Sequence, residues 1–181
     1  MKLDTHTEKG RQHREQETRL EQFLKHSYPQ LDFLHTDPDK PAALDLLVLS
    51  GRIPSAVAEI KCRNNPMAYF EERGSLLITD HKRLMLGEVS KAFHVPGYVI
   101  LYSIPDDDIR VSIVTDRTGL FCYHSPTATT QTQATCNGGT AERLNAYLPW
   151  RWFRDLCAAD FTLPLEVQRD SLLNVYPGSK S

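Results

Sequence analysis

The sequence predicts an α/β fold in which a mixed β-sheet is flanked by helices. Three features indicate it. A segment with helical periodicity (9–26) precedes three strand-like runs, a second helical segment (80–93) follows them, and an apolar strand (97–104) comes next. The order helix, strand, strand, strand, helix, strand, with more strands after it, implies helices packed on the faces of a sheet.

Length and composition set the scale of the fold. With 181 residues, 40% of them hydrophobic, we expect a single domain over 1–181, with its core at about 10–104, an extension at about 105–173 and a mobile tail at 174–181. No apolar run is long enough for a membrane span, and the polar start does not resemble a signal peptide, so we expect an intracellular protein. A net charge of −2 argues against a nonspecific nucleic-acid coat protein but leaves a local basic groove open.

The first half of the chain has the clearest local signals. Residues 9–26 lack proline and carry an apolar stripe at helical spacing: Leu20, Phe23 and Leu24. Residues 31–35 indicate a short strand, and 36–41 form a proline-bearing loop. Residues 42–65 contain two apolar runs joined by a turn about Arg52, which predicts a hairpin. Thr79 can cap the second helix, whose apolar stripe comprises Met85, Leu86, Val89 and Phe93.

The second half of the chain is harder to interpret. Residues 109–114 and 119–124 look like another hairpin, which would extend the sheet. Residues 125–140 are rich in Thr, Gln and Gly and indicate a surface loop or a frayed edge strand. The aromatic segment 146–156 predicts a terminal helix packed on the core.

Charged residues stand among the apolar residues of the 42–65 hairpin. Glu59 and Lys61 project from the same side of their strand because successive side chains alternate. With the turn about Arg52, Asp45 falls opposite Glu59, at a Cβ separation of about 4.5–5.5 Å. Two carboxylates at this distance repel, so something must neutralise them.

A divalent cation is one solution, because Mg²⁺ favours oxygen ligands and is commonly held by one or two carboxylates. Lys61 could then orient the attacking water or stabilise charge developing on a phosphate. The alternative is an ion pair between Asp45 and Lys61 at a strand end, with Glu59 reaching solvent.

Asp45 and the run Glu59-Ile60-Lys61, placed after one helix and before another, resemble the motif of the PD-(D/E)XK nuclease superfamily over about residues 10–104. The resemblance implies a restriction-endonuclease-like fold with an αβββαβ core. It implies Mg²⁺ or Mn²⁺ held by Asp45, Glu59 and the main-chain carbonyl of Ile60, with Lys61 assisting the hydrolytic water.

The sequence departs from the motif in one place, since Leu44 rather than proline precedes Asp45. The literal pair Pro38-Asp39 offers a rival aspartate. In the predicted register Asp39 would pair with a position about six residues beyond Glu59, which is about 20 Å along the strand at roughly 3.3 Å per residue. Geometry therefore favours Asp45, and the loop itself explains Asp39.

Two further residues are candidates for the same site. Many members of the superfamily bring an acid of the first helix to the metal, and Glu17 lies on the flank of the apolar face whereas Glu21 is farther round. Lys82 stands on the apolar stripe of the second helix, where the superfamily often places a residue near the scissile phosphate. The alternatives are a solvated Glu17 and a Lys82 that covers apolar surface.

Together these features predict a nuclease dependent on Mg²⁺ or Mn²⁺ that hydrolyses nucleic-acid phosphodiesters, with DNA favoured over RNA and no membrane partner. Residues 74–104 resemble small phage-encoded or prophage-encoded restriction-endonuclease-like proteins, which implies the cytoplasm of a bacterial or phage-infected cell. The alternative function is a catalytically silent module of this fold that binds DNA or a protein. Endonuclease or exonuclease action and the oligomeric state, a homodimer included, stay open.

Overall fold

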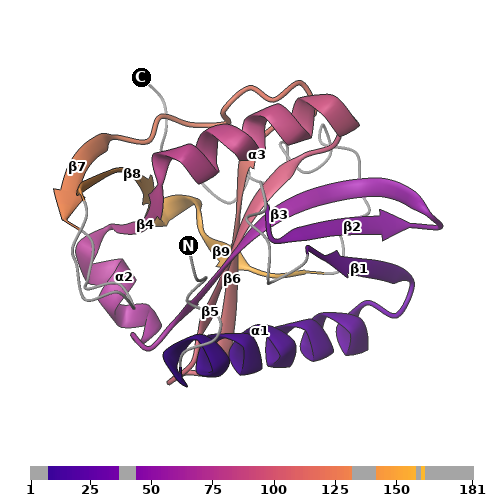
Figure 1. Ribbon diagram of the computed structural model, residues 1–181, viewed down its shortest axis with the longest axis horizontal. Coiled ribbons are helices and arrows are strands. Elements are labelled where there is room, and N and C mark those ends of the chain that lie inside the picture. Colours follow the sequence, from indigo (N-terminus) through magenta and orange to yellow (C-terminus); the bar gives the residue numbers. More distant parts are fainter. Residues whose placement is uncertain (1–7, 37–43, 132–141, 158–159, 162–181) are drawn as a thin grey trace.

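The computed structural model describes residues 8–36, 44–131, 142–157 and 160–161. Within them, helices cover both faces of a six-stranded sheet, and a three-stranded sheet stands at one end (Figure 1). The larger sheet has the order β1-β2-β3-β5-β6-β9, formed by β1 (Leu31–His35), β2 (Leu46–Ser50), β3 (Ile53–Arg63), β5 (Gly97–Ser103), β6 (Asp108–Thr115) and β9 (Arg154–Asp155). Only β3 and β5 pair in parallel in this sheet, which is therefore mixed.

The chain order of the elements confirms the predicted fold class. Helix α1 (Glu8–Ser27) precedes the antiparallel strands β1, β2 and β3, and helix α3 (Asp80–Phe93) leads into β5, which runs parallel to β3. This is the α/β architecture with the αβββαβ order that the resemblance implied. A short helix and a strand, α2 (Met67–Arg73) and β4 (Ser75–Thr79), are inserted between β3 and α3 and were not predicted.

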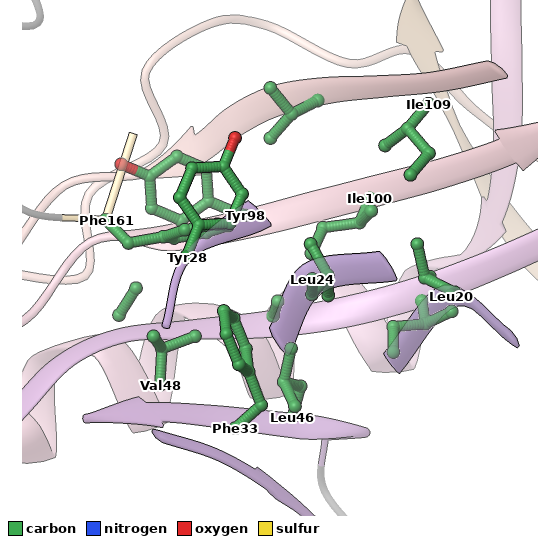
Figure 2. Packing of buried hydrophobic residues seen from close by; sticks show 14 of the residues in the cluster. Leu20, Leu24, Tyr28, Phe33, Leu46, Val48, Tyr98, Ile100, Ile109 and Phe161 are labelled. Carbon is green, nitrogen blue, oxygen red and sulfur yellow. The ribbon is translucent and has the colours of Figure 1, made fainter. Parts of the chain in front are cut away.

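Two apolar clusters lie on opposite faces of the larger sheet. In the first, Leu20 and Leu24 of α1 cluster with Leu46 of β2 and Ile100 of β5 (Figure 2). The even-numbered residues of β3, among them Ile60, belong to the same cluster. In the second, Leu86 of α3 packs with Val57, an odd-numbered residue of β3. Odd-numbered residues of β3 share one face, so Glu59 and Lys61 project toward α3 on the same side as Val57. Strand alternation thus aims these charges at one helix.

The three-stranded sheet is antiparallel, in the order β4-β8-β7, and adds β7 (Thr127–Gln131) and β8 (Glu142–Pro149) to β4. Of the two alternatives for 125–140, the edge strand is correct for β7, while residues 132–141 lie outside the described residues. The three-stranded sheet therefore pairs β4, which is inserted within the αβββαβ core, with strands of the C-terminal extension.

The predicted terminal helix over 146–156 is wrong. Its first part belongs to β8, in which Ala146 and Leu148 are buried while Tyr147 is half-buried, the alternation of a strand. Pro149 ends β8, and only a single 3₁₀ turn follows, Trp150–Trp152, before β9. Aromatic density had suggested a packed helix, whereas the period-two pattern decides the conformation.

The predicted strand over 119–124 is also wrong, because only Phe121 makes an isolated bridge there, to Thr115. The Asp116 side chain instead accepts hydrogen bonds from the Thr118 N–H and hydroxyl and from the Leu120 N–H. This local turn competes with strand pairing. Gly119 has φ +82° and lies against the backbone of α3, so it cannot continue a strand.

The tail over 174–181, predicted to be mobile, lies outside the described residues. Among the helices of the described residues, none is long and apolar enough to cross a bilayer.

Candidate active site

The β2–β3 hairpin brings Asp45 and Glu59 together. Gly51 and Arg52 both have positive φ and form the turn, at the predicted place. The register shifts between Val48 and Leu49, so that Leu46 pairs with Ala58. Continued by one residue, this register sets Asp45 opposite Glu59. The predicted alignment of Asp45 with Glu59 is therefore the one that this register gives, but a β-bulge produces it rather than the regular hairpin that we expected.

Asp45 lies just before β2 and is held by β3. Its N–H donates to the Ala58 carbonyl at 3.3 Å, and its Oδ2 accepts the Ile60 N–H at 2.9 Å. Its Oδ1 accepts a hydrogen bond from Lys82 Nζ at 3.0 Å. Main-chain contacts fix this carboxylate, and Lys82 reaches it from α3.

Glu59 is the more buried carboxylate, only 2% exposed. Lys61 Nζ donates to its Oε1 and also to the Ile60 carbonyl, at 3.2 Å. Lys82 Nζ lies 3.0 Å from Oε2 but without hydrogen-bond geometry, and among the described residues Oε2 accepts no hydrogen bond. The ion pair of Asp45 with Lys61 and the solvent-exposed Glu59 of the alternative interpretation are both wrong. Nor is Lys82 a surface-covering lysine.

We name Asp45, Glu59, Lys61 and Lys82 the charged cluster. Its two ammonium groups balance its two carboxylates, so these residues neutralise one another. The need for neutralisation was predicted, whereas the groups that meet it here are lysines. A lysine on the apolar stripe of a helix was the available signal, because such a residue needs a partner.

Burial and neighbouring charges together shift the pKa values of the two carboxyls in opposite directions. Burial raises the pKa of Glu59, Lys61 lowers it and Asp45 raises it, and the net direction is upward. Burial also raises the pKa of Asp45, but Lys61, Lys82 and the Ile60 N–H outweigh burial, and the net direction is downward. Glu59 therefore takes up a proton before Asp45 does. Neighbouring acids whose pKa values shift in opposite directions are typical of functional sites.

Glu17 of α1 is within the electrostatic reach of the charged cluster. Burial raises its pKa first, Asp45 and Glu59 raise it further, and Lys61 and Lys82 lower it. Glu21 instead pairs with Lys25, at 2.5 Å, and its other oxygen lies 3.6 Å from His35 Nε2. Of the two helix acids, the structure brings Glu17 to the site. The rival Asp39 lies outside the described residues.

The donors of the charged cluster fit a hard divalent cation. Two carboxylates and the Ile60 carbonyl supply oxygen, and Glu59 Oε2 is buried without a hydrogen bond. Lys61 Nζ contacts Glu59 Oε1, and Lys82 Nζ contacts Asp45 Oδ1 and Glu59 Oε2. A cation bound to these oxygens would therefore have to displace at least Lys82. In the described part of the chain, no three His, Cys, Asp or Glu side chains are grouped closely enough to hold a metal ion by themselves.

Arg63 was given no role from the sequence. It projects from the same face of β3 as Glu59 and Lys61, two residues farther along, and strand alternation was the signal that could have found it. Burial lowers the pKa of its guanidinium, while Cys62 and Glu59 raise it. Its guanidinium donates a hydrogen bond to the Cys62 carbonyl at 3.0 Å.

Comparison with known proteins gives little beyond the geometry. No protein-family model and no curated protein matches the sequence. Among solved structures, the chain is similar to Hjc of Archaeoglobus fulgidus, a Holliday junction resolvase from an archaeal hyperthermophile. The two are 17% identical, the alignment covers 54% of this chain and 73% of the other, and the TM-score is 0.41.

Proposed function

We propose that the chain is a nuclease dependent on Mg²⁺ or Mn²⁺ that hydrolyses phosphodiester bonds, with DNA as the favoured substrate. The observation that carries the proposal is the pairing of two carboxylates, Asp45 and the buried Glu59, which lie together under two ammonium groups. Two acids held together where one of them is removed from water call for an explanation, and a functional role is one.

Asp45, Glu59 and the Ile60 carbonyl are the groups that would hold the metal. When bound, the ion would polarise a phosphoryl oxygen and lower the pKa of water. Glu17 would add a further carboxylate from α1. These roles agree with the pKa directions, because Asp45, the more acidic carboxyl, is ionised at a lower pH than Glu59.

Charge balance explains why the substrate would be an anion. The charged cluster is neutral as it stands, so a divalent cation would give it an excess of two positive charges. Lys82, displaced from the carboxylates, would be free to bind a phosphate, and Lys61 would orient the attacking water or stabilise charge on the phosphate. A phosphodiester satisfies both lysines, and it is the group that nucleic acids present along their whole length.

The proposal is tested by incubating linear, circular, single-stranded and branched DNA, and RNA, with the protein in Mn²⁺, in Mg²⁺ and in a chelator. Cleavage is expected with metal only. Lys61→Ala is expected to abolish it and not to weaken metal-induced stabilisation, because an ammonium is not a metal ligand. The control is Lys25→Ala, an exposed lysine paired only with Glu21, which should cleave like the parent. No cleavage of any substrate in any metal would overturn the proposal.

One observation favours the second candidate, a silent module that binds DNA or a protein. The charged cluster is already neutral without a cation, so it could stabilise the hairpin against α3 and do nothing else. The same assay separates the two: DNA binding by the parent with no cleavage, together with a melting temperature indifferent to Mn²⁺, would assign the cluster to structure.

A further inference from the structure

A groove of about 610 Å³ lies beside the charged cluster. Its walls come from the end of β3, from α2 and β4, and from β7 and β8, so most of them belong to the three-stranded sheet and its connection rather than to the αβββαβ core. Of the described side chains that line it, none is acidic and three are arginines: Arg63, Arg73 and Arg143. In a chain with a net charge of −2, this local excess needs an explanation.

None of the three arginines has an ion-pair partner among the described carboxylates. Arg63 is half-buried and donates only to the Cys62 carbonyl. Arg73 donates to the Tyr69 hydroxyl at 2.6 Å, and its guanidinium lies 5.3 Å from the centre of that ring. Arg143 is exposed on β8. Of the three, Arg63 is partly removed from water without an anion, which is costly, so an anionic ligand in the groove would stabilise it.

Residues that line the groove are close in sequence to the charged cluster and to Glu17. Arg63 follows Lys61 on the same face of β3. Gln16, which lines the groove, precedes Glu17, and the Gln16 Oε1 atom is buried without a hydrogen bond among the described residues. Thr79, also in the wall, is the residue before α3, the helix that carries Lys82. A chain of phosphates lying in the groove would therefore extend toward the carboxylates.

We propose that this groove binds a single-stranded segment of nucleic acid next to the phosphodiester to be cleaved. The arginines contact its phosphates, and Tyr69 and Tyr147, which line the groove and are half-buried, offer faces for its bases. The volume falls in the range of about 300–1,000 Å³ that holds small ligands, which suits a few nucleotides of one strand. This inference rests on the proposed function for its substrate class.

The test measures binding without catalysis. Fluorescence anisotropy of a labelled oligothymidylate is followed in a chelator over a series of salt concentrations, for the parent and for Arg73→Gln/Arg143→Gln. Each phosphate contact with a single strand contributes about 0.7 to the slope of log affinity against log salt, so the double variant should lose about 1.4. The control is Arg52→Gln/Arg151→Gln, which removes two exposed arginines that lie outside the groove and have no ion pair among the described residues. This variant should keep the parental slope.

The outcomes are distinct from those of the cleavage test. An equal slope for the groove variant and the control would overturn the proposal that the groove binds nucleic acid, even if the parent cleaves DNA. Tighter binding of a matched duplex than of the single strand, with the same dependence on Arg73 and Arg143, would overturn the single-strand assignment. Binding of inorganic phosphate or a mononucleotide with no gain for the oligomer would do the same. If the parent binds the oligomer and the groove variant shows the expected change in slope, but no DNA is cleaved, the binding groove is supported and the nuclease activity is contradicted. Unchanged melting temperatures establish that both variants fold.

Discussion

Two of the buried groups of charges among the described residues differ in how completely they are bonded. Asp160, only 1% exposed, receives both terminal nitrogens of Arg154, one of them at 2.9 Å, and the Cys157 N–H at 2.7 Å. Each of its carboxylate oxygens is bonded. The charged cluster places two carboxylates side by side under two lysines and leaves Glu59 Oε2 without a hydrogen bond among the described residues.

The difference separates structure from function. A carboxylate matched by a bidentate arginine is complete, and any change to it costs stability. A cluster that brings two acids together is less favourable, because each acid raises the cost of ionising the other and lysines must offset that cost. The Arg154–Asp160 pair holds the end of β9 to Asp160, whereas the charged cluster is the group to which the proposed function gives a chemical role.

The largest effect should come from breaking the complete pair. Arg154→Met leaves the Asp160 carboxylate buried without its cation, which should lower the free energy of unfolding by about 3–5 kcal/mol. Urea denaturation measures it. Arg110→Met is the matched control: Arg110 pairs with the more exposed Asp108 and Asp155, so its loss should cost about 1 kcal/mol or less. Equal losses would remove the distinction between the two groups.

Lys82→Gln should have an intermediate effect on stability and an opposite effect on metal binding. Asp45 and Glu59 lose a shared cation, but Lys82 is 25% exposed, so we expect a loss of about 1–2 kcal/mol rather than that of a fully buried pair. With the competing ammonium gone, the gain in melting temperature on adding Mn²⁺ should exceed that of the parent. DNA binding should weaken and depend less on salt. A smaller metal-induced gain would mean that Lys82 does not occupy the cation position.

Glu59→Gln should change stability least at neutral pH, within about 1 kcal/mol, because the amide keeps an acceptor for Lys61 and removes a charge that burial opposes. Its pH dependence is the sharper measurement. The folded pKa of Glu59 is raised above its ordinary 4.5, so its contribution to stability is full below pH 4.5 and is lost as pH rises through the folded pKa. Glu59→Gln should therefore gain on the parent as pH rises from about 4.5.

The contribution of Asp45 to stability depends on pH in the opposite direction. Its pKa lies below the ordinary 3.8, so its contribution is present above that pH and is lost on acidification. A difference between Glu59→Gln and the parent that stays constant from acid to neutral pH would contradict the separation of the two acids.

Local pattern predicted the parts of the fold that local physics decides. The stripes of α1 and α3 follow helical spacing, and the turn at Arg52 lies between two apolar runs, so these elements and the site hairpin could be predicted. The bulge at Val48 could not, although it sets the register that brings Asp45 opposite Glu59. Its cause lies in the pairing of two strands rather than in either one.

Contacts between distant segments escaped prediction. β4 pairs with β8, about seventy residues later in the chain, with Leu76 opposite Leu148, and nothing in either segment alone marks that partnership. The groove that this sheet forms with the end of β3 was missed for the same reason. For Lys82, its place on an apolar stripe showed that it needs a partner, but only the packing of α3 on β3 shows that the partners are two carboxylates.

The central claim is that Asp45 and Glu59 form a divalent-cation site, and the melting temperature in a Mn²⁺ titration tests it most directly. The parent and Asp39→Asn should be stabilised in proportion to the logarithm of metal over dissociation constant, while Asp45→Asn should not respond. All three should share the same circular-dichroism spectrum. A parental melting temperature unchanged across millimolar Mn²⁺, or a response lost in Asp39→Asn and kept in Asp45→Asn, would contradict the account.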